Sequence, residues 1–211
     1  DELNYFLTQA PAEMAVNAST GALTWIPSVN DVGLHNVSLS VSDGFANAIQ
    51  SFALNVSSNC VVPFKGMKIK NNTILCYGNY TIASVSSILS IENVVGVTLD
   101  CNGAWLLSPG GQTGGGVGIY AASNVTVKNC GVKGYFDGIS ADNSNNVTLL
   151  NNTLTDNNAG FDVWNSSNLF MTSTYSCRNE LYDIVTYYSN NYSGANNTCS
   201  KTRGWNDSGF A

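Results

Sequence analysis

Hydrophobic and polar residues alternate along the first part of the chain. Valine and leucine alternate with serine in residues 37–42, and residues 52–56 resume the alternation after an Asp-Gly pair. A period of two is typical of strands with one buried face, and Asp-Gly is a turn signal. The pattern predicts a small β module over residues 1–57.

A different pattern follows and repeats every 22 residues. Apolar triplets begin at Val125, Val147 and Leu169, and an asparagine precedes each of them. An earlier copy begins at Val97, and the longer interval after it accommodates the glycine-rich loop 109–116. A repeat of this length, built from short β-branched runs bounded by Asn and Gly, predicts a solenoid of strands and turns.

Stacked coils of this kind form a parallel β-helix, because a single coil cannot bury its own apolar face. We expect Ile119, Ile139 and Phe161 to stack on one inner wall. We expect a second wall from three pairs: Val125 with Val127, Val147 with Leu149, and Leu169 with Met171. The turn asparagines tolerate left-handed backbone and are expected to hydrogen-bond between coils. A second β-sandwich is the alternative.

The first segment resembles the cadherin-like immunoglobulin modules of microbial surface proteins and of dystroglycan. The landmarks are Tyr5, Pro11, Met14, Gly21, Trp25-Ile26-Pro27, Asp31-Val32-Gly33, Ser42-Asp43-Gly44 and Phe52. The resemblance implies an immunoglobulin-like sandwich that lacks the family's first strand, which lies upstream of Tyr5. Calcium sites of related modules draw on that absent region, so we expect no metal here.

Residues 60–199 resemble the right-handed β-helix of the pectin-lyase-like superfamily. The stretches that carry the resemblance include VVGVTLDCNGAWLLS and GIYAASNVTVKNCGVKGYFDGISADNSNNVTLLNN. They are most similar to the NosD-type class of carbohydrate-binding and sugar-hydrolase repeats on microbial surfaces. The resemblance implies the fold and says little about function, because function depends on sites that differ within one fold.

The predicted fold class is therefore all-β, with a small immunoglobulin-like β-sandwich followed by a short right-handed parallel β-helix. The module is expected over residues 1–57 and the β-helix over 58–211. We expect an N-terminal cap at about 58–87 and a degraded last coil at about 180–211.

Composition narrows the function classes. Charged residues make up 10% of the chain and the net charge is −6, so we expect no nucleic-acid partner, since nucleic-acid binding needs clustered Lys and Arg. No apolar run approaches the roughly 18 residues of a membrane span. Because the chain begins at Asp1 without Met, we expect a mature or excised stretch whose targeting signal has been removed.

Asparagine supplies 29 of the 211 residues, and 12 of them begin an Asn-x-Ser/Thr triplet. Residue frequencies alone would give roughly six such triplets, so the excess predicts covalent N-glycans on an extracellular chain. The alternative is that stacked asparagines beside Ser and Thr produce the triplet incidentally. The predicted sites are Asn17, Asn36, Asn55, Asn71, Asn79, Asn124, Asn146, Asn151, Asn165, Asn191, Asn196 and Asn206.

The cysteines are Cys60, Cys76, Cys101, Cys130, Cys177 and Cys199. Their number is even and none forms a CxxC or a Cys/His metal spacing, so they predict disulfides in an oxidising compartment rather than a metal site. Cys177 and Cys199 lie one coil apart, and Cys101 and Cys130 lie one residue off equivalent positions on adjacent coils. Cys60 is left to pair with Cys76. Reduced core cysteines are the alternative.

Glycoside hydrolysis needs two carboxylates at a defined separation. The candidates are Asp137, Asp142, Asp156, Asp162 and Asp183. A 22-residue register places Asp142 over Trp164 and places Asp162 between Ser140 and Ile184, so no two carboxylates stack. We therefore expect no catalytic residues and no enzyme.

No cofactor is expected either. The NosD resemblance suggests copper handling, yet the chain has one His, in the first module, and three separated Met. Copper sites of the usual kinds need more such ligands.

The leading functional prediction is an extracellular, N-glycosylated structural protein, a building block of a cell-surface layer or filament. Its partners are expected to be copies of itself, joined head to tail by strand complementation at an open edge of the first module. A glycan-binding adhesion module is the first alternative, with Trp164, Tyr187 and Tyr188 as rings that stack on external carbohydrate; core filling is the other role open to these rings. A degenerate polysaccharide lyase or hydrolase is the second alternative.

Overall fold

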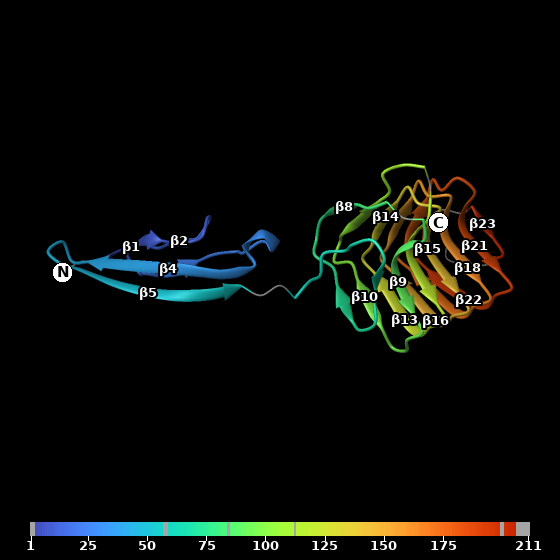
Figure 1. Ribbon diagram of the computed structural model, residues 1–211, viewed down its shortest axis with the longest axis horizontal. Coiled ribbons are helices and arrows are strands. Elements are labelled where there is room, and N and C mark those ends of the chain that lie inside the picture. The colour runs from blue at the N-terminus through green and yellow to red at the C-terminus, as the bar shows by residue number, and fades with distance from the viewer. Residues whose placement is uncertain (1–2, 57–58, 84, 112, 199–200, 206–211) are drawn as a thin grey trace. The chain divides into compact units, whose positions relative to one another are not determined.

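The computed structural model describes residues 3–56, 59–83, 85–111, 113–198 and 201–205. The chain divides into two compact units, Asp1–Asn59 and Cys60–Ala211, close to the expected boundary (Figure 1). Strands form both units, with one 3₁₀ turn at Val29–Asp31 among the described residues. The all-β prediction is confirmed. No helix in those residues is long and apolar enough to cross a membrane.

The first unit contains a three-stranded antiparallel sheet of order β1-β4-β5 and a separate two-stranded ribbon of β2 and β3. The bounds are β1 (Asn4–Gln9), β2 (Ala15–Val16), β3 (Leu23–Thr24), β4 (Gly33–Ser42) and β5 (Asn47–Val56). The Asp43 carboxylate accepts hydrogen bonds from the backbone N–H groups of Phe45 and Ala46, at 2.9 and 2.8 Å, and so closes the β4–β5 hairpin at the expected turn.

The immunoglobulin-like sandwich expected over residues 1–57 is not clearly shown. Most side chains of β5 are exposed, and in β4 only Val37 and Ser40 are buried. Among the described strands, β1 and β5 are the two edges of the three-stranded sheet.

The second unit is a parallel β-solenoid of about six coils, made of three parallel sheets. The seven-stranded sheet has the order β23-β21-β18-β15-β12-β9-β6. Its strands are β6 (Met67–Lys68), β9 (Ser87–Glu92), β12 (Gly115–Tyr120), β15 (Asp137–Asp142), β18 (Ala159–Trp164), β21 (Tyr182–Tyr187) and β23 (Thr202–Arg203).

Two further sheets complete each coil. The six-stranded sheet contains β7 (Thr73–Ile74), β10 (Thr98–Asp100), β13 (Ser123–Lys128), β16 (Asn145–Leu150), β19 (Ser167–Thr172) and β22 (Asn190–Ala195). The five-stranded sheet contains β8 (Asn79–Thr81), β11 (Trp105–Leu107), β14 (Gly131–Lys133), β17 (Thr153–Thr155) and β20 (Tyr175–Cys177).

Both ends of the solenoid are more regular than the sequence predicted. The expected cap contains β6, β7 and β8, which pair in parallel with β9, β10 and β11 and so form a first coil. The expected degraded coil contains β21 and β22, which pair with β18 and β19, and β23 adds to β21.

The inner wall of the six-stranded sheet follows the 22-residue repeat as predicted. Val125, Val147 and Leu169 pair in succession across β13, β16 and β19. The second column of Val127, Leu149 and Met171 does the same, and all six side chains are buried.

The prediction for the other wall was wrong in register. Ile119 pairs with Ala141 and not with Ile139, which lies between Val117 and Phe161. All of these side chains are buried. The sequence comparison had joined Ile119 to Ile139, which are 20 residues apart, whereas the strands pair at 22.

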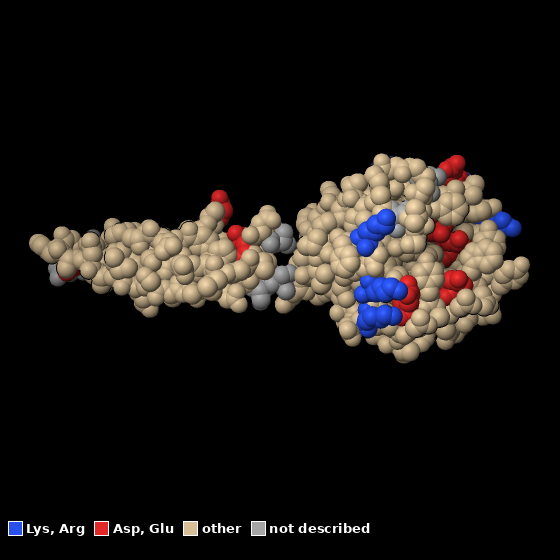
Figure 2. Space-filling view, in the orientation of Figure 1, with Lys and Arg blue, Asp and Glu red and all other residues tan. Residues whose placement is uncertain are grey.

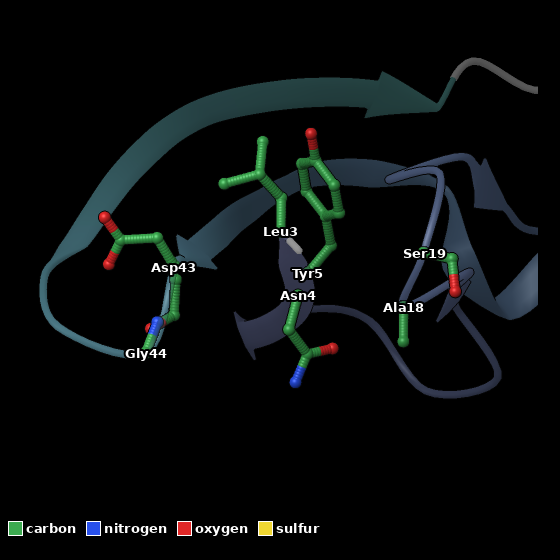
Figure 3. A pocket seen from close by; sticks show the side chains of 8 residues that line it. Leu3, Asn4, Tyr5, Ala18, Ser19, Asp43 and Gly44 are labelled. Carbon is green, nitrogen blue, oxygen red and sulfur yellow. The ribbon is translucent and has the colours of Figure 1, made fainter. Parts of the chain in front are cut away.

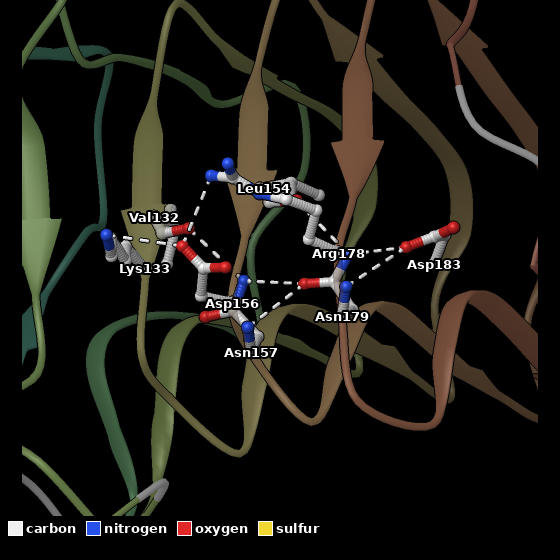
Figure 4. Close-up of polar contacts among 8 residues, drawn as sticks. All are labelled: Val132, Lys133, Leu154, Asp156, Asn157, Arg178, Asn179 and Asp183. Carbon is white, nitrogen blue, oxygen red and sulfur yellow. Dashed lines mark hydrogen bonds and ion pairs between the residues drawn. The ribbon is translucent and has the colours of Figure 1, made fainter.

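Buried asparagines connect the coils. The Oδ1 atoms of Asn152, Asn157 and Asn179 each accept a hydrogen bond from a backbone N–H 22 residues earlier, at 3.0 to 3.1 Å. Their Nδ2 atoms donate to backbone carbonyls of the preceding coil, as Figure 4 shows for Asn157 and Asn179. The backbone groups at these corners are therefore paired although they are buried.

Exposed asparagines form ladders on the surface, as expected. The Nδ2 of Asn146 donates to the Oδ1 of Asn124 at 2.6 Å, and Asn165 donates to Asn143 at 2.6 Å. All four have positive φ, the left-handed conformation that Asn tolerates better than most residues.

The structure contains the disulfides Cys60–Cys76 and Cys101–Cys130, the pairings that the sequence predicted. Cys177 is also disulfide-bonded, but its expected partner Cys199 lies outside the described residues. Disulfides are typical of secreted or extracellular proteins.

Two phenylalanines on neighbouring strands test the inward and outward assignments. Phe161 is 1% exposed and Phe170 is 41% exposed. Phe161→Ala should lower the free energy of unfolding by about 3–5 kcal/mol because it leaves a cavity. Phe170→Ala, the matched control, should change it by less than about 1 kcal/mol. Urea denaturation followed by circular dichroism measures both, and equal losses would contradict the assignment.

Candidate functional site

The outer face of the seven-stranded sheet carries three aspartates. Alternation along β15 and β18 turns Ile139 and Phe161 into the core. The partly buried Asp137 and Asp142 of β15 and Asp162 of β18 are left outside that core. We refer to Asp137, Asp142 and Asp162 as the acidic cluster.

Register brings the members of the cluster close together although none is directly opposite another. Asp162 pairs with Ser140, so Asp142, two residues further along β15, is its diagonal neighbour. Strand spacing and rise then place these two Cα atoms about 8 Å apart. Carboxylate pairs of glycosidases are separated by about 5–9.5 Å, a range that side chains from such positions can span.

Two carboxyl oxygens of the cluster are buried without a partner. The Oδ1 atoms of Asp137 and Asp162 have no hydrogen-bond donor within reach. Burying an unpaired charge is costly, so such groups tend to take up a proton instead. Burial, and to a lesser extent the negative charge of Asp162, raise the pKa of Asp137 to about 7.

Asp162 follows the same logic with partial compensation. Burial raises the pKa of its carboxyl, and the nearby charge of Asp142 adds to the increase. Hydrogen bonds from Trp164 and from the Val163 backbone act in the opposite direction. Because two coupled carboxyls do not both ionise easily, Asp137 holds a proton near neutral pH while Asp162 carries the charge.

A cavity of about 270 Å³ opens beside Asp137. It lies between β9, β12 and β15 and brings aromatic rings next to the carboxyl. Its lining consists of Val85, Ser86, Ser87, Gly114, Gly115, Tyr120, Phe136 and Asp137.

Aromatic rings continue the same face. Trp164 pairs with Asp142 on one side and with Tyr187 on the other. The Trp164 and Tyr187 rings stack at 4.4 Å between centroids, and the Tyr188 ring lies 5.9 Å from that of Trp164. Trp164 is 43% exposed and Tyr188 is 84% exposed. The three rings that the sequence singled out for carbohydrate therefore lie together on the surface.

The remaining candidates have structural roles. Asp156 forms ion pairs with Lys133 at 3.2 Å and Arg178 at 3.3 Å, and Asp183 accepts a hydrogen bond from the Asn179 amide, as Figure 4 shows. The described residues contain no group of three or more His, Cys, Asp and Glu side chains placed to hold a metal ion.

The predicted glycosylation sites divide by position. Asn206 lies outside the described residues, and the other eleven asparagines are exposed. Asn146, Asn151, Asn165 and Asn191 each donate one amide hydrogen to an asparagine of the preceding coil. An amide nitrogen has two hydrogens, so this ladder leaves one for other contacts.

The first unit has concavities but few chemical groups. Figure 3 shows an open one of about 730 Å³, lined by residues such as Tyr5, Ser19 and Asp43. Its one carboxylate, Asp43, already holds the β4–β5 turn. The unit contains no Lys or Arg, and the blue side chains in Figure 2 all lie on the solenoid unit.

Comparisons with known proteins agree on the solenoid. A family model described as a right-handed β-helix region matches residues 108–210. The catalytic domain of a GH87 alpha-1,3-glucanase, in complex with tetrasaccharides, is a similar solved structure, with 16% identity and a TM-score of 0.45. The match covers 66% of this chain and 32% of that one, so this chain spans about a third of its length. No curated protein sequence matches this chain.

The structural comparison corrects the expectation that the chain is not an enzyme, since the β-helix that it found is the catalytic domain of a glycoside hydrolase. The stacking argument behind that expectation was also incomplete. It placed Asp162 beside Ile184, whereas the last repeat is 23 residues long and the neighbour is Val185. It considered directly opposed residues only and so missed the diagonal pair and Asp137.

The raised pKa of Asp137 predicts an unusual effect on stability. The folded state holds this proton up to about pH 7, whereas an unfolded Asp releases it near pH 4. The free energy of unfolding should therefore fall as the pH rises from about 4 to 7 and stay low above that.

Asp137→Asn removes the ionisation and should stabilise the protein at pH 8 by roughly 2–4 kcal/mol, with little effect at pH 4. Asp156→Asn loses only exposed ion pairs and serves as the control, with an expected loss of at most about 1 kcal/mol. Thermal and urea melts at both pH values measure the difference, and a destabilised Asp137→Asn at pH 8 would contradict the assignment.

Proposed function

We propose that the protein binds a carbohydrate chain on the outer face of the seven-stranded sheet and hydrolyses a glycosidic bond there. The observation that supports it most is the pair of buried, unpartnered carboxyl oxygens of Asp137 and Asp162 beside exposed, stacked aromatic rings. A sheet that serves only as a scaffold gains nothing from this arrangement, because each unsatisfied buried polar group costs about 1–3 kcal/mol.

The aromatic rings supply the binding surface. Trp164, Tyr187 and Tyr188 combine apolar faces with polar edges, which suits a sugar ring with its apolar face and peripheral hydroxyls. The carboxylates beside them accept hydrogen bonds from hydroxyl groups. The rings and the acidic cluster therefore form one continuous site across β12, β15, β18 and β21.

The two carboxyls supply the acid and its partner. Asp137, protonated near neutral pH, donates its proton to the glycosidic oxygen as the bond to the anomeric carbon breaks. The Asp162 carboxylate supports the positive charge that develops on the sugar and assists the attack on its anomeric carbon. Asp142, the diagonal neighbour, keeps the site negative. Water supplies the hydroxyl of the new reducing end and restores the Asp137 proton.

The activity test is the release of reducing ends from a panel of neutral and acidic polysaccharides. Asp137→Asn and Asp162→Asn should each lower the rate by about 10²-fold or more. Activity should decline above about pH 7 as Asp137 loses its proton. Asp156→Asn, outside the site, should retain wild-type activity. No release from any substrate, or equal rates in all variants, would contradict hydrolysis.

Binding is tested separately with the catalytically impaired Asp137→Asn protein on a glycan array and by isothermal titration calorimetry. Adding Trp164→Ala should weaken binding roughly tenfold, because it removes a ring worth about 0.5–1.5 kcal/mol or more. Phe170→Ala, an equally exposed ring on the six-stranded sheet, is the control and should leave binding unchanged. The reverse result would place the glycan on the other sheet.

Three sequence-based predictions remain proposals. We propose N-glycans at the exposed Asn-x-Ser/Thr sites, an extracellular location, and a cadherin-like origin for the first unit. Head-to-tail assembly through the β5 edge is also retained as a proposal. No observation here supports a filament role, whereas the aromatic and acidic face favours carbohydrate.

A further inference from the structure

Tyr120 occupies an unusual position beside Asp137. It is the last residue of β12 and pairs with Glu92 and Asp142 on the outer face. Its hydroxyl hydrogen-bonds the Ser87 hydroxyl at 2.7 Å, and Ser87 pairs with Gly115 at the other end of the strand. The phenol ring therefore runs back along β12 over the sheet instead of projecting into solvent.

Glycines make room for that ring. A Cβ added at Gly118 would lie 2.3 Å from Cε2 and from the hydroxyl oxygen of Tyr120 and 2.4 Å from the Ser87 hydroxyl. At Gly115 a Cβ would lie 2.9 Å from the Ser87 hydroxyl. Neither glycine has a positive φ, so the lack of a side chain, and not backbone freedom, is what the structure uses here.

The ring forms one wall of the 270 Å³ cavity whose other walls include Asp137 and Phe136. Phe136 is 49% exposed, so both aromatic residues are accessible from the cavity. The volume lies just below the roughly 300–1,000 Å³ of pockets for drug-sized ligands, which suits one sugar ring. Asp137 is the one charged residue of the lining, and the cavity offers no cation to an acidic sugar.

We propose that this cavity is the subsite for one uncharged pyranose ring of the substrate, and that Tyr120 is the residue that determines its specificity. Ser87 and the bare position at Gly118 are positioning elements that hold the phenol ring against the sheet. The inference rests on the proposed function and names the sugar class that the site takes. The ring in the subsite lies beside Asp137, whose proton then reaches the glycosidic oxygen.

The experiment measures binding to the Asp137→Asn protein, which keeps the shape of the site. The probes are neutral oligosaccharides of glucose, galactose and mannose, with uronic-acid oligosaccharides as the charged comparison. Titration calorimetry gives the affinity, and saturation-transfer NMR identifies the sugar ring in contact. Tyr120→Ala should weaken binding of the neutral probe roughly tenfold. Tyr120→Phe, which keeps the ring, should stay within about threefold of the parent.

Tyr175→Ala is the matched control, because Tyr175 is a partly exposed tyrosine on the five-stranded sheet. It should bind like the parent. Gly118→Ala should weaken binding as Tyr120→Ala does, since the added methyl displaces the ring. In the Tyr120→Ala background, Gly118→Ala should cause no further loss, because the displaced ring is already gone. Circular dichroism melts confirm that each variant is folded.

The outcomes separate this inference from the proposed function. Wild-type binding by Tyr120→Ala, together with loss of binding by Trp164→Ala, overturns the subsite and leaves the proposed function standing. Tighter binding of uronic-acid than of neutral oligosaccharides overturns the assignment of an uncharged ring. Failure of the parent protein to bind any oligosaccharide overturns both proposals.

Discussion

Parallel, in-register pairing between successive coils determines where every side chain of the solenoid points. One coil cannot bury its own apolar face, so each depends on its neighbours for burial and for backbone hydrogen bonds. The buried amides of Asn152, Asn157 and Asn179 tie that register at the corners, where strand pairing is interrupted. A shift of one residue would turn the whole inner wall outward. The same constraint aligns outward residues into columns, and a functional surface follows from their identity.

On the seven-stranded sheet that surface opposes stability. Strand pairing brings Asp142 beside Trp164 and close to Asp162, and burial leaves oxygens of Asp137 and Asp162 without partners. The solenoid tolerates this cost because its core is continuous through the neighbouring coils. Strained or unsatisfied groups that persist in an otherwise well-paired fold are typical of functional sites. The acidity of Asp137 is therefore a product of the fold, and the proposed chemistry uses it.

The sequence was sufficient for the solenoid wherever the repeat was constant. The columns at Val147 and Leu149 followed directly from the 22-residue interval. Errors arose where the interval changed, as with Val185, which a 23-residue repeat placed beside Asp162. The carboxylate site was missed because alignment compares opposed residues only, whereas charges also interact diagonally and through burial. The bare positions at Gly115 and Gly118 gave no sequence signal, since the ring that fills them lies across the strand.

The central claim is that Asp137 and Asp162 act as a coupled pair with one proton near neutral pH. NMR titration of carboxyl carbons in ¹³C-aspartate-labelled protein measures this directly. The account predicts that Asp137 titrates at about pH 7, and that Asp162→Asn lowers its pKa because a neighbouring negative charge is lost. An Asp137 carboxyl that titrates near the ordinary value of about 4, unaffected by Asp162→Asn, would contradict the account.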